Sequence, residues 1–156
     1  VADQAVRREL GAGTGEGALA TGHRGRITMM AVELNHTIVG AVDAQASARW
    51  LAEMLDLAEP VAAGFFWQVE TANGVALDFA PVGDGTITPQ HYAFLISEAE
   101  FDQVHARLLA GGHDIWADPR QRLPGEINRN DGGRGVYFEG PDGHFFEALT
   151  VPYGGA

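Results

Sequence analysis

The feature that most constrains this 156-residue chain is an internal repeat. A short β-branched run at 34–39 is followed by an apolar pattern with helical spacing, and then by strand-like runs at 65–70 and 75–80. The same order recurs from residue 91: a strand, a helical stretch and further strands. Such a repeat predicts two similar modules that pack together in an α+β fold.

Capping signals mark the two expected helices. In the first half, Asp43 is a candidate N-cap and Pro60 closes the helical region. In the second half, Ser97 and Glu100 have the spacing of a capping box, and Gly111 with the next glycine ends the helix. Further strands are expected at 115–117, 136–139 and 145–151, with a Gly/Asn-rich loop at 128–135.

The chain divides into a glycine-rich leader at 1–30 and one domain at 31–154. The sequence pattern indicates neither a strand before the glycines of the leader nor a helix after them, so a nucleotide-binding loop is not expected there. We expect a flexible leader, with a swapped or packing arm as the alternative. Within the domain, module 1 is expected at 31–83 and module 2 at 89–154.

Composition narrows the function by exclusion. A net charge of −11 argues against nucleic acid, and no apolar run approaches the roughly 20 residues that span a membrane. The absence of cysteine and lysine excludes a thiolate metal site, Schiff-base chemistry and a Walker-type phosphate loop. Arg7 and Arg8 have no apolar segment behind them, so they do not indicate a secretory signal. We expect a cytoplasmic protein whose partner is a small molecule.

Three residues of metal-ligand type occupy comparable places in the two halves. His36 and His91 each lie near the start of the first strand of their half. The interval from His91 to Glu147 is almost the same as the interval from His36 to His91. Strand alternation places Glu147 on one face with apolar Phe145 and Leu149, which is costly for an unpaired carboxylate. Two imidazoles and one carboxylate suit a facial Fe, Mn, Ni, Co or Zn site. The alternative is two hydrogen-bonded core histidines and a glutamate paired with an arginine.

Three segments resemble the vicinal oxygen chelate superfamily, which includes glyoxalase I, extradiol dioxygenases, fosfomycin-resistance enzymes and bleomycin-binding proteins. They are Leu34-Asn35-His36, Gln90-His91-Tyr92-Ala93-Phe94 and Gly140-Pro141-Asp142-Gly143-His144-Phe145-Phe146-Glu147. The resemblance covers 31–154. It implies paired βαβββ modules that form a cupped mixed sheet around one metal ion held by His36, His91 and Glu147, commonly in a homodimer.

The activity implied by this resemblance is that of a glyoxalase- or dioxygenase-like enzyme: a lyase, isomerase or dioxygenase acting on a small oxygenated substrate. One divalent ion (Fe²⁺, Mn²⁺, Ni²⁺, Co²⁺ or Zn²⁺) would chelate two substrate oxygens and act as a Lewis acid. The alternative is a metal-free protein that sequesters a drug, as bleomycin-resistance members do, and a third reading is an inactive duplicate. The sequence leaves open whether the site forms within one chain or across a swapped dimer.

Two further residues are placed by the resemblance. Tyr137 lies ten residues before Glu147, where extradiol dioxygenases have a tyrosine, and we expect it to act with Glu147 in catalysis or else to pack. Those enzymes also have a histidine shortly before that tyrosine, whereas this chain has Asn-Arg-Asn-Asp at 128–131, which argues against ring cleavage. Asp78, the module 1 counterpart of Glu147, is a candidate fourth ligand, with a solvent- or arginine-paired role as the alternative.

Candidate substrate-binding residues lie in the loops and on the aromatic strands. Arg129 and Arg134 flank the glycine-rich loop and would clamp an anionic substrate, unless they pair with surface acids. Phe66 and Trp67 are candidates for the lining of an apolar pocket, with a place in the core as the alternative.

Overall fold

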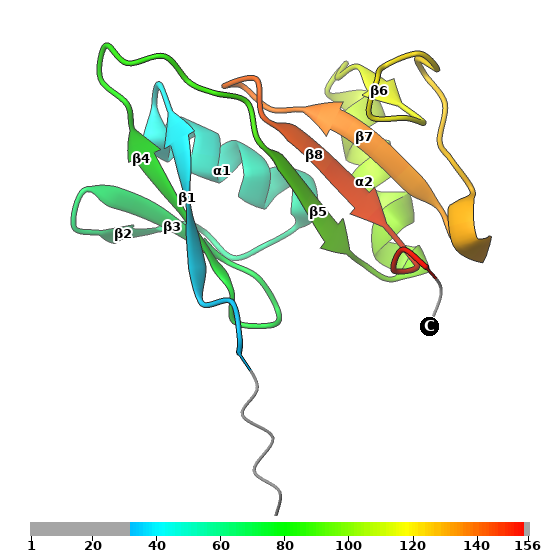
Figure 1. The fold of residues 1–156 in the computed structure, drawn as a ribbon, viewed down its shortest axis with the longest axis horizontal. Coiled ribbons are helices and arrows are strands. Elements are labelled where there is room, and N and C mark those ends of the chain that lie inside the picture. The colour runs from blue at the N-terminus through cyan, green and yellow to red at the C-terminus, as the bar shows by residue number, and fades with distance from the viewer. Residues whose placement is uncertain (1–31, 155–156) are drawn as a thin grey trace, which may run out of the picture. The chain divides into compact units, whose positions relative to one another are not determined.

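The computed structural model describes residues 32–154, so the leader expected at 1–30 lies outside the described residues. Two four-stranded sheets, each with one helix, follow one another along the chain (Figure 1). Module 1 contains β1 (His36–Ala41), α1 (Ala44–Leu55), β2 (Val61–Ala63), β3 (Phe66–Glu70) and β4 (Ala76–Pro81). Module 2 contains β5 (His91–Leu95), α2 (Glu98–Ala110), β6 (Ile115–Trp116), the short 3-10 helix η1 (Asn130–Gly132), β7 (Gly135–Glu139) and β8 (Phe145–Leu149). The predicted α+β fold of two βαβββ modules is confirmed, and β2 is the strand of module 1 that the residue pattern did not locate.

The two sheets have the same strand order and matching registers. The orders are β1-β4-β3-β2 and β5-β8-β7-β6, with the outer first strand parallel to its neighbour and the other pairs antiparallel. His36 lies opposite Ala76, and His91 lies opposite Phe145. Asp78 and Glu147, each two residues further along, therefore occupy equivalent places on the two sheets.

The helix boundaries follow the predicted caps. The Asp43 carboxylate accepts a hydrogen bond from Ala46 N at 3.0 Å, and α1 ends at Asp56, whose φ of 59° is left-handed. At α2, Ser97 N donates to the Glu100 carboxylate at 2.7 Å, and Glu100 N donates to Ser97 Oγ at 3.3 Å. None of the helices within 32–154 has the length and apolar character needed to cross a membrane.

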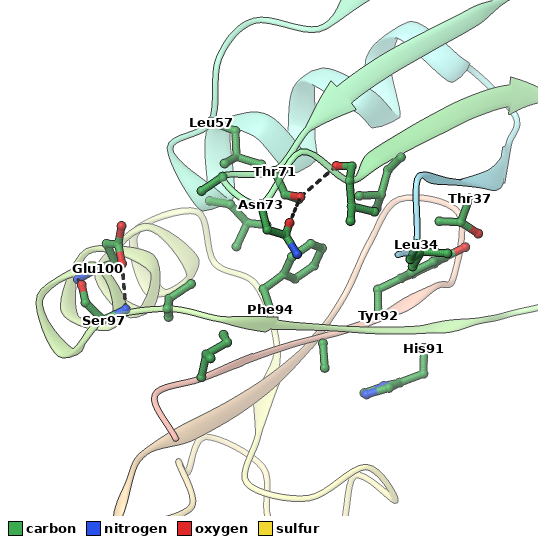
Figure 2. Close-up of a pocket in the computed structure, with 17 residues that line it drawn as sticks. Leu34, Thr37, Leu57, Thr71, Asn73, His91, Tyr92, Phe94, Ser97 and Glu100 are labelled. Carbon is green, nitrogen blue, oxygen red and sulfur yellow. Dashed lines mark hydrogen bonds between the residues drawn. The ribbon is translucent and has the colours of Figure 1, made fainter. Parts of the chain in front are cut away.

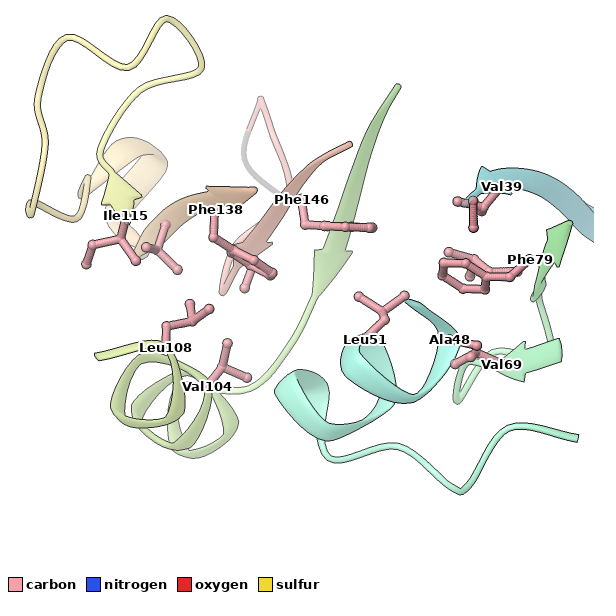
Figure 3. Packing of buried hydrophobic residues seen from close by; sticks show 14 of the residues in the cluster. Val39, Ala48, Leu51, Val69, Phe79, Val104, Leu108, Ile115, Phe138 and Phe146 are labelled. Atoms are coloured by element: carbon pink, nitrogen blue, oxygen red, sulfur yellow. The ribbon is translucent and has the colours of Figure 1, made fainter. Parts of the chain in front are cut away.

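One apolar core serves both modules. Leu51 and Ala48 of α1 face the inner residues of the first sheet, and Val104 and Leu108 of α2 face those of the second (Figure 3). Trp50 of α1 joins the two halves. Its ring centroid lies 6.1 Å and 5.8 Å from those of Phe138 and Phe146 in module 2. The modules are thus held together by shared burial of apolar surface.

The turn between β7 and β8 adds polar links between the modules. Asp142 accepts hydrogen bonds from Val42 N at 2.8 Å and from the Ser47 hydroxyl, both in module 1. His144 is buried, and its Nε2 lies 2.7 Å from Gly40 O while Nδ1 accepts from Gln90 N at 3.1 Å. Because Gln90 N can only donate, Nε2 carries the imidazole proton and donates to Gly40 O. His144 is thus a buried contact between the modules.

Candidate metal centre

Glu147 lies in the middle of β8 with its side chain on the face opposite the core. Its sequence neighbours Phe146 and Ala148 belong to the core, and its cross-strand neighbours are Ala93 on β5 and Tyr137 on β7. The Glu147 side chain is only 1% exposed. A buried carboxylate is expensive unless hydrogen bonds or a cation compensate for lost hydration.

One oxygen of this carboxylate accepts no hydrogen bond from the residues that the structure describes. Among the described residues, Glu147 Oε2 is a buried side-chain atom without a hydrogen-bond partner. The nearest basic group is His91, whose Nε2 lies 3.3 Å from Oε2 and whose side chain is 44% exposed. An orphaned carboxylate oxygen beside an accessible imidazole nitrogen is a donor pair that fits a divalent cation. The expected pairing of His91 with Glu147 across two strands is therefore present.

The other oxygen of Glu147 is held by tyrosines. Tyr153, in the turn after β8, donates from its hydroxyl to Glu147 Oε1 at 2.5 Å, and the Tyr137 hydroxyl lies 2.6 Å from that of Tyr153. Burial, then the bonds to Tyr153 and Glu147, raise the pKa of Tyr137 well above its ordinary value. Burial and the bond to Glu147 likewise raise the pKa of Tyr153. Tyr137 thus acts on Glu147 both directly and through Tyr153, a residue that the sequence analysis did not single out.

His36 begins β1 on the other sheet, on an exposed stretch of the strand. Its Nδ1 lies 2.8 Å from Asn35 Oδ1, so Nδ1 carries the proton and Nε2 is left as the free ligand atom. Within residues 32–154, however, no three His, Asp or Glu side chains come together as a metal-holding group. One copy of the chain therefore brings His91 and Glu147 together and leaves His36 apart from them.

Asp78 occupies the module 1 position that corresponds to Glu147. It is buried on β4, and its Oδ1 accepts a hydrogen bond from Gln68 Nε2 on β3 at 2.8 Å. Gln68 stands opposite Asp78 just as Tyr137 stands opposite Glu147. Asp78 is thus paired with an amide where an arginine was considered from the sequence, and its role as a fourth ligand stays a prediction.

Arg134 is engaged within module 2. Its guanidinium donates to Glu98 Oε2 at 2.5 Å, to Asp102 Oδ1 at 2.6 Å and to Glu98 O at 2.8 Å, and it lies 4.4 Å from the ring centroid of Phe101. These contacts tie the start of β7 to α2. They correspond to the alternative of pairing with surface acids, and they correct the expectation that Arg134 clamps a substrate.

The other candidates for substrate contact separate into two groups. Trp67 lies opposite Phe79 and packs against the core, which corrects its assignment to a substrate pocket. Its neighbour Phe66 points to the opposite face of the sheet because side chains alternate along a strand. Arg129 is exposed and, among the described residues, forms no ion pair. It lies two residues before Asp131, whose negative charge helps to raise the pKa of Tyr153.

A groove of about 760 Å³ runs along β5 between the two modules. Tyr92 and Phe94 point into it, and Leu34, Leu57 and Thr71 line its other side (Figure 2). His91 extends from the opposite side of β5 (Figure 2). His91 also lines the groove, so the groove reaches the residue that meets Glu147.

Comparisons with known proteins agree with the fold. No family model matches the chain. Two solved structures, Oxidase ChaP-H1 and Oxidase ChaP-H2, are 58% and 56% identical, cover 80% and 81% of this chain and 100% and 98% of theirs, and superpose with a TM-score of 0.78 each. A glyoxalase/dioxygenase from Nostoc punctiforme shares the fold at 23% identity and a TM-score of 0.59, covering 89% of this chain and 99% of its own.

A curated relative matches over a shorter part of the chain. Metallothiol transferase FosB from Shouchella clausii (strain KSM-K16) is 37% identical over 60 residues, which make up 38% of this chain and 37% of FosB. The chain thus matches little more than a third of that relative's length.

Proposed function

This chain belongs to the vicinal oxygen chelate superfamily, as its motifs predicted, and on that premise we propose that it is a divalent-metal-dependent oxidase acting on a small oxygenated substrate. The names of the two relatives above 50% identity favour reaction with dioxygen over the lyase and isomerase reactions. A site of two histidines and one carboxylate with open positions is the arrangement that non-haem Fe(II) oxygenases use. When bound, the metal supplies Lewis acidity toward a chelating substrate and redox chemistry toward dioxygen.

The observation that carries the proposal is the unpartnered Oε2 of Glu147 beside His91 Nε2. A protein that works by sequestration alone has no need to bury a carboxylate with a free oxygen, because that burial costs stability. In the metal site, His91 and Glu147 present Nε2 and Oε2. Asn35 keeps the proton of His36 on Nδ1, which leaves His36 Nε2 as the third ligand atom.

His36 of a second copy completes this ligand set. His36 begins β1 and His91 begins β5, and each of these strands is the outer strand of its sheet. Large apolar side chains close to the two histidines are exposed in the single chain: Leu34 is 66%, Ile38 53% and Leu95 60% exposed. A second copy that covers these strands would bury that apolar surface and bring its own His36 toward His91 and Glu147.

The substrate would meet the metal on the same face. Phe66 supplies apolar contact from β3, and Arg129 supplies positive charge from the loop before η1. The Tyr137 hydroxyl is bonded to Tyr153, so its role is to support the Glu147 carboxylate.

The test is metal content and oxygen uptake of the intact protein. Protein purified anaerobically without a chelator or a histidine tag is analysed by plasma mass spectrometry as wild type, His91→Ala and the control His105→Ala, which alters a histidine on α2. We expect near-stoichiometric metal in the wild type and control and none in His91→Ala. Oxygen uptake with oxygen-chelating phenolic test compounds is expected to follow metal content. A wild type that stays empty after Fe²⁺ is added back would refute the proposal.

A further inference from the structure

We infer that Tyr153 is a positioning residue for Glu147. Its hydroxyl holds one oxygen of the Glu147 carboxylate, so that only the other oxygen faces the metal. The inference rests on the proposed metal site. It concerns the turn that follows β8, where Tyr153 reaches back to the carboxylate from six residues further along the chain.

The donor directions follow from counting protons. An ionised carboxylate can only accept, so the single hydroxyl proton of Tyr153 is used on Glu147 Oε1. Tyr137 must then donate to the Tyr153 oxygen across the 2.6 Å contact. The hydrogen bonds run in one direction, from Tyr137 to Tyr153 to Glu147. Tyr153 therefore makes the bond to Oε1, while Tyr137 bonds to Tyr153 and also acts directly on the Glu147 carboxylate.

The two tyrosines differ in how they are held. Tyr137 is buried on β7, whereas Tyr153 is 58% exposed beyond the end of the sheet. Packing therefore contributes little to the position of Tyr153, and its hydroxyl contacts are what hold it in place. The result is an unequal carboxylate, with Oε1 bonded and Oε2 free beside His91. That inequality selects binding of the metal through a single oxygen.

The experiment compares wild type, Tyr153→Phe and the matched control Tyr137→Phe, which removes the outer hydroxyl and keeps the bond to Glu147. Co²⁺ is titrated in competition with a chromophoric chelator, and the visible spectrum is recorded at saturation. We expect Tyr153→Phe to weaken Co²⁺ binding about 10- to 100-fold, as loss of a ligand's hydrogen-bond partner does. Its bands should also lose intensity as Glu147 gains a second bound oxygen. Tyr137→Phe should have a smaller effect than Tyr153→Phe, because it keeps the Tyr153 bond to Oε1.

A measurement on the metal-free protein tests this inference separately from the proposed function. In apoprotein labelled with ¹³C at glutamate side-chain carboxyls, the Glu147 signal is assigned from its loss in Glu147→Gln. We expect that signal to move in Tyr153→Phe more than in Tyr137→Phe. An unmoved signal, or unchanged Co²⁺ affinity and spectrum in Tyr153→Phe, overturns the inference. A wild type that binds no Co²⁺ overturns the metal site, while a shifted carboxyl signal would still establish the Tyr153 contact.

Discussion

The two modules share one plan and differ at the position where a carboxylate meets the face opposite the core. In module 2, Glu147 is bonded by tyrosine at one oxygen and free at the other. In module 1, the shorter Asp78 is bonded by the amide of Gln68. The repeat supplies equivalent strand positions, while the length of the acid and the identity of its cross-strand neighbour differ between the modules.

The largest effect on metal binding and stability should come from removing the charge of the Glu147 carboxylate in module 2. Glu147→Gln is expected to abolish metal binding, measured by plasma mass spectrometry. The same change should raise the apoprotein's free energy of unfolding by about 1–3 kcal/mol, because it removes a buried charged oxygen that lacks a partner. Urea unfolding of apoprotein checks the second effect. A destabilised apoprotein would show that Glu147 is already fully compensated without metal.

The turns before β8 and β4 should differ next. The turn in module 2 reaches module 1 through Asp142, whereas in module 1 the Thr71 hydroxyl bonds within its own turn, to Asn73 at 2.6 Å and to Val75 O at 2.8 Å. We expect Asp142→Ala to cost about 2–3 kcal/mol because two module 1 donors lose a charged acceptor. Asn73→Ala should cost about 0.5 kcal/mol or less, as surface changes do. Equal losses in urea unfolding would contradict this contrast.

A smaller, pH-dependent effect is expected at α2. A hydrogen bond from Thr150, followed by the Arg134 guanidinium, lowers the pKa of Glu98 below its ordinary 4.5 despite partial desolvation. A lowered pKa in the folded state contributes stability above the unfolded-state value and loses it as pH falls through the folded value. Arg134→Met should therefore flatten the decline of stability below about pH 4.5. The check is thermal unfolding between pH 7 and pH 3, with Glu98→Gln as the control. An acid decline as steep as that of wild type would count against this assignment.

The smallest effect should be on metal content when the module 1 acid is changed. Asp78→Asn keeps the size of the side chain and an oxygen that can accept from Gln68, so metal content should equal that of wild type. Loss of metal in this variant would make Asp78 a fourth ligand, and the two modules would then be functionally alike.

Much of this comparison could be read from the sequence because it depends on periodic patterns. Strand alternation placed Glu147 on one face with Phe145 and Leu149, and the repeat placed His36 and His91 at equivalent strand starts. The same alternation puts Phe66 and Trp67 on opposite faces, so their assignment to one pocket was wrong for Trp67.

Contacts that carry no periodic signal were not predictable. Tyr153 lies beyond the last strand, and nothing in its neighbours indicates that it turns back to Glu147. The bond from His144 to Gly40 O joins positions 104 residues apart, and its acceptor is a backbone oxygen that any residue would provide. The strand β2 is three exposed residues long, too short for an alternating pattern to be recognised.

The central claim is that one copy supplies His36 to the His91 and Glu147 of another. Its most direct test is co-expression of His36→Ala and Glu147→Ala chains with different tags, isolation of the mixed dimer, and measurement of its metal content. Each variant alone should bind no metal, whereas the mixed dimer should bind one ion, because one of its two sites receives three intact ligands. A mixed dimer that remains empty while wild-type dimer is loaded would contradict the shared site.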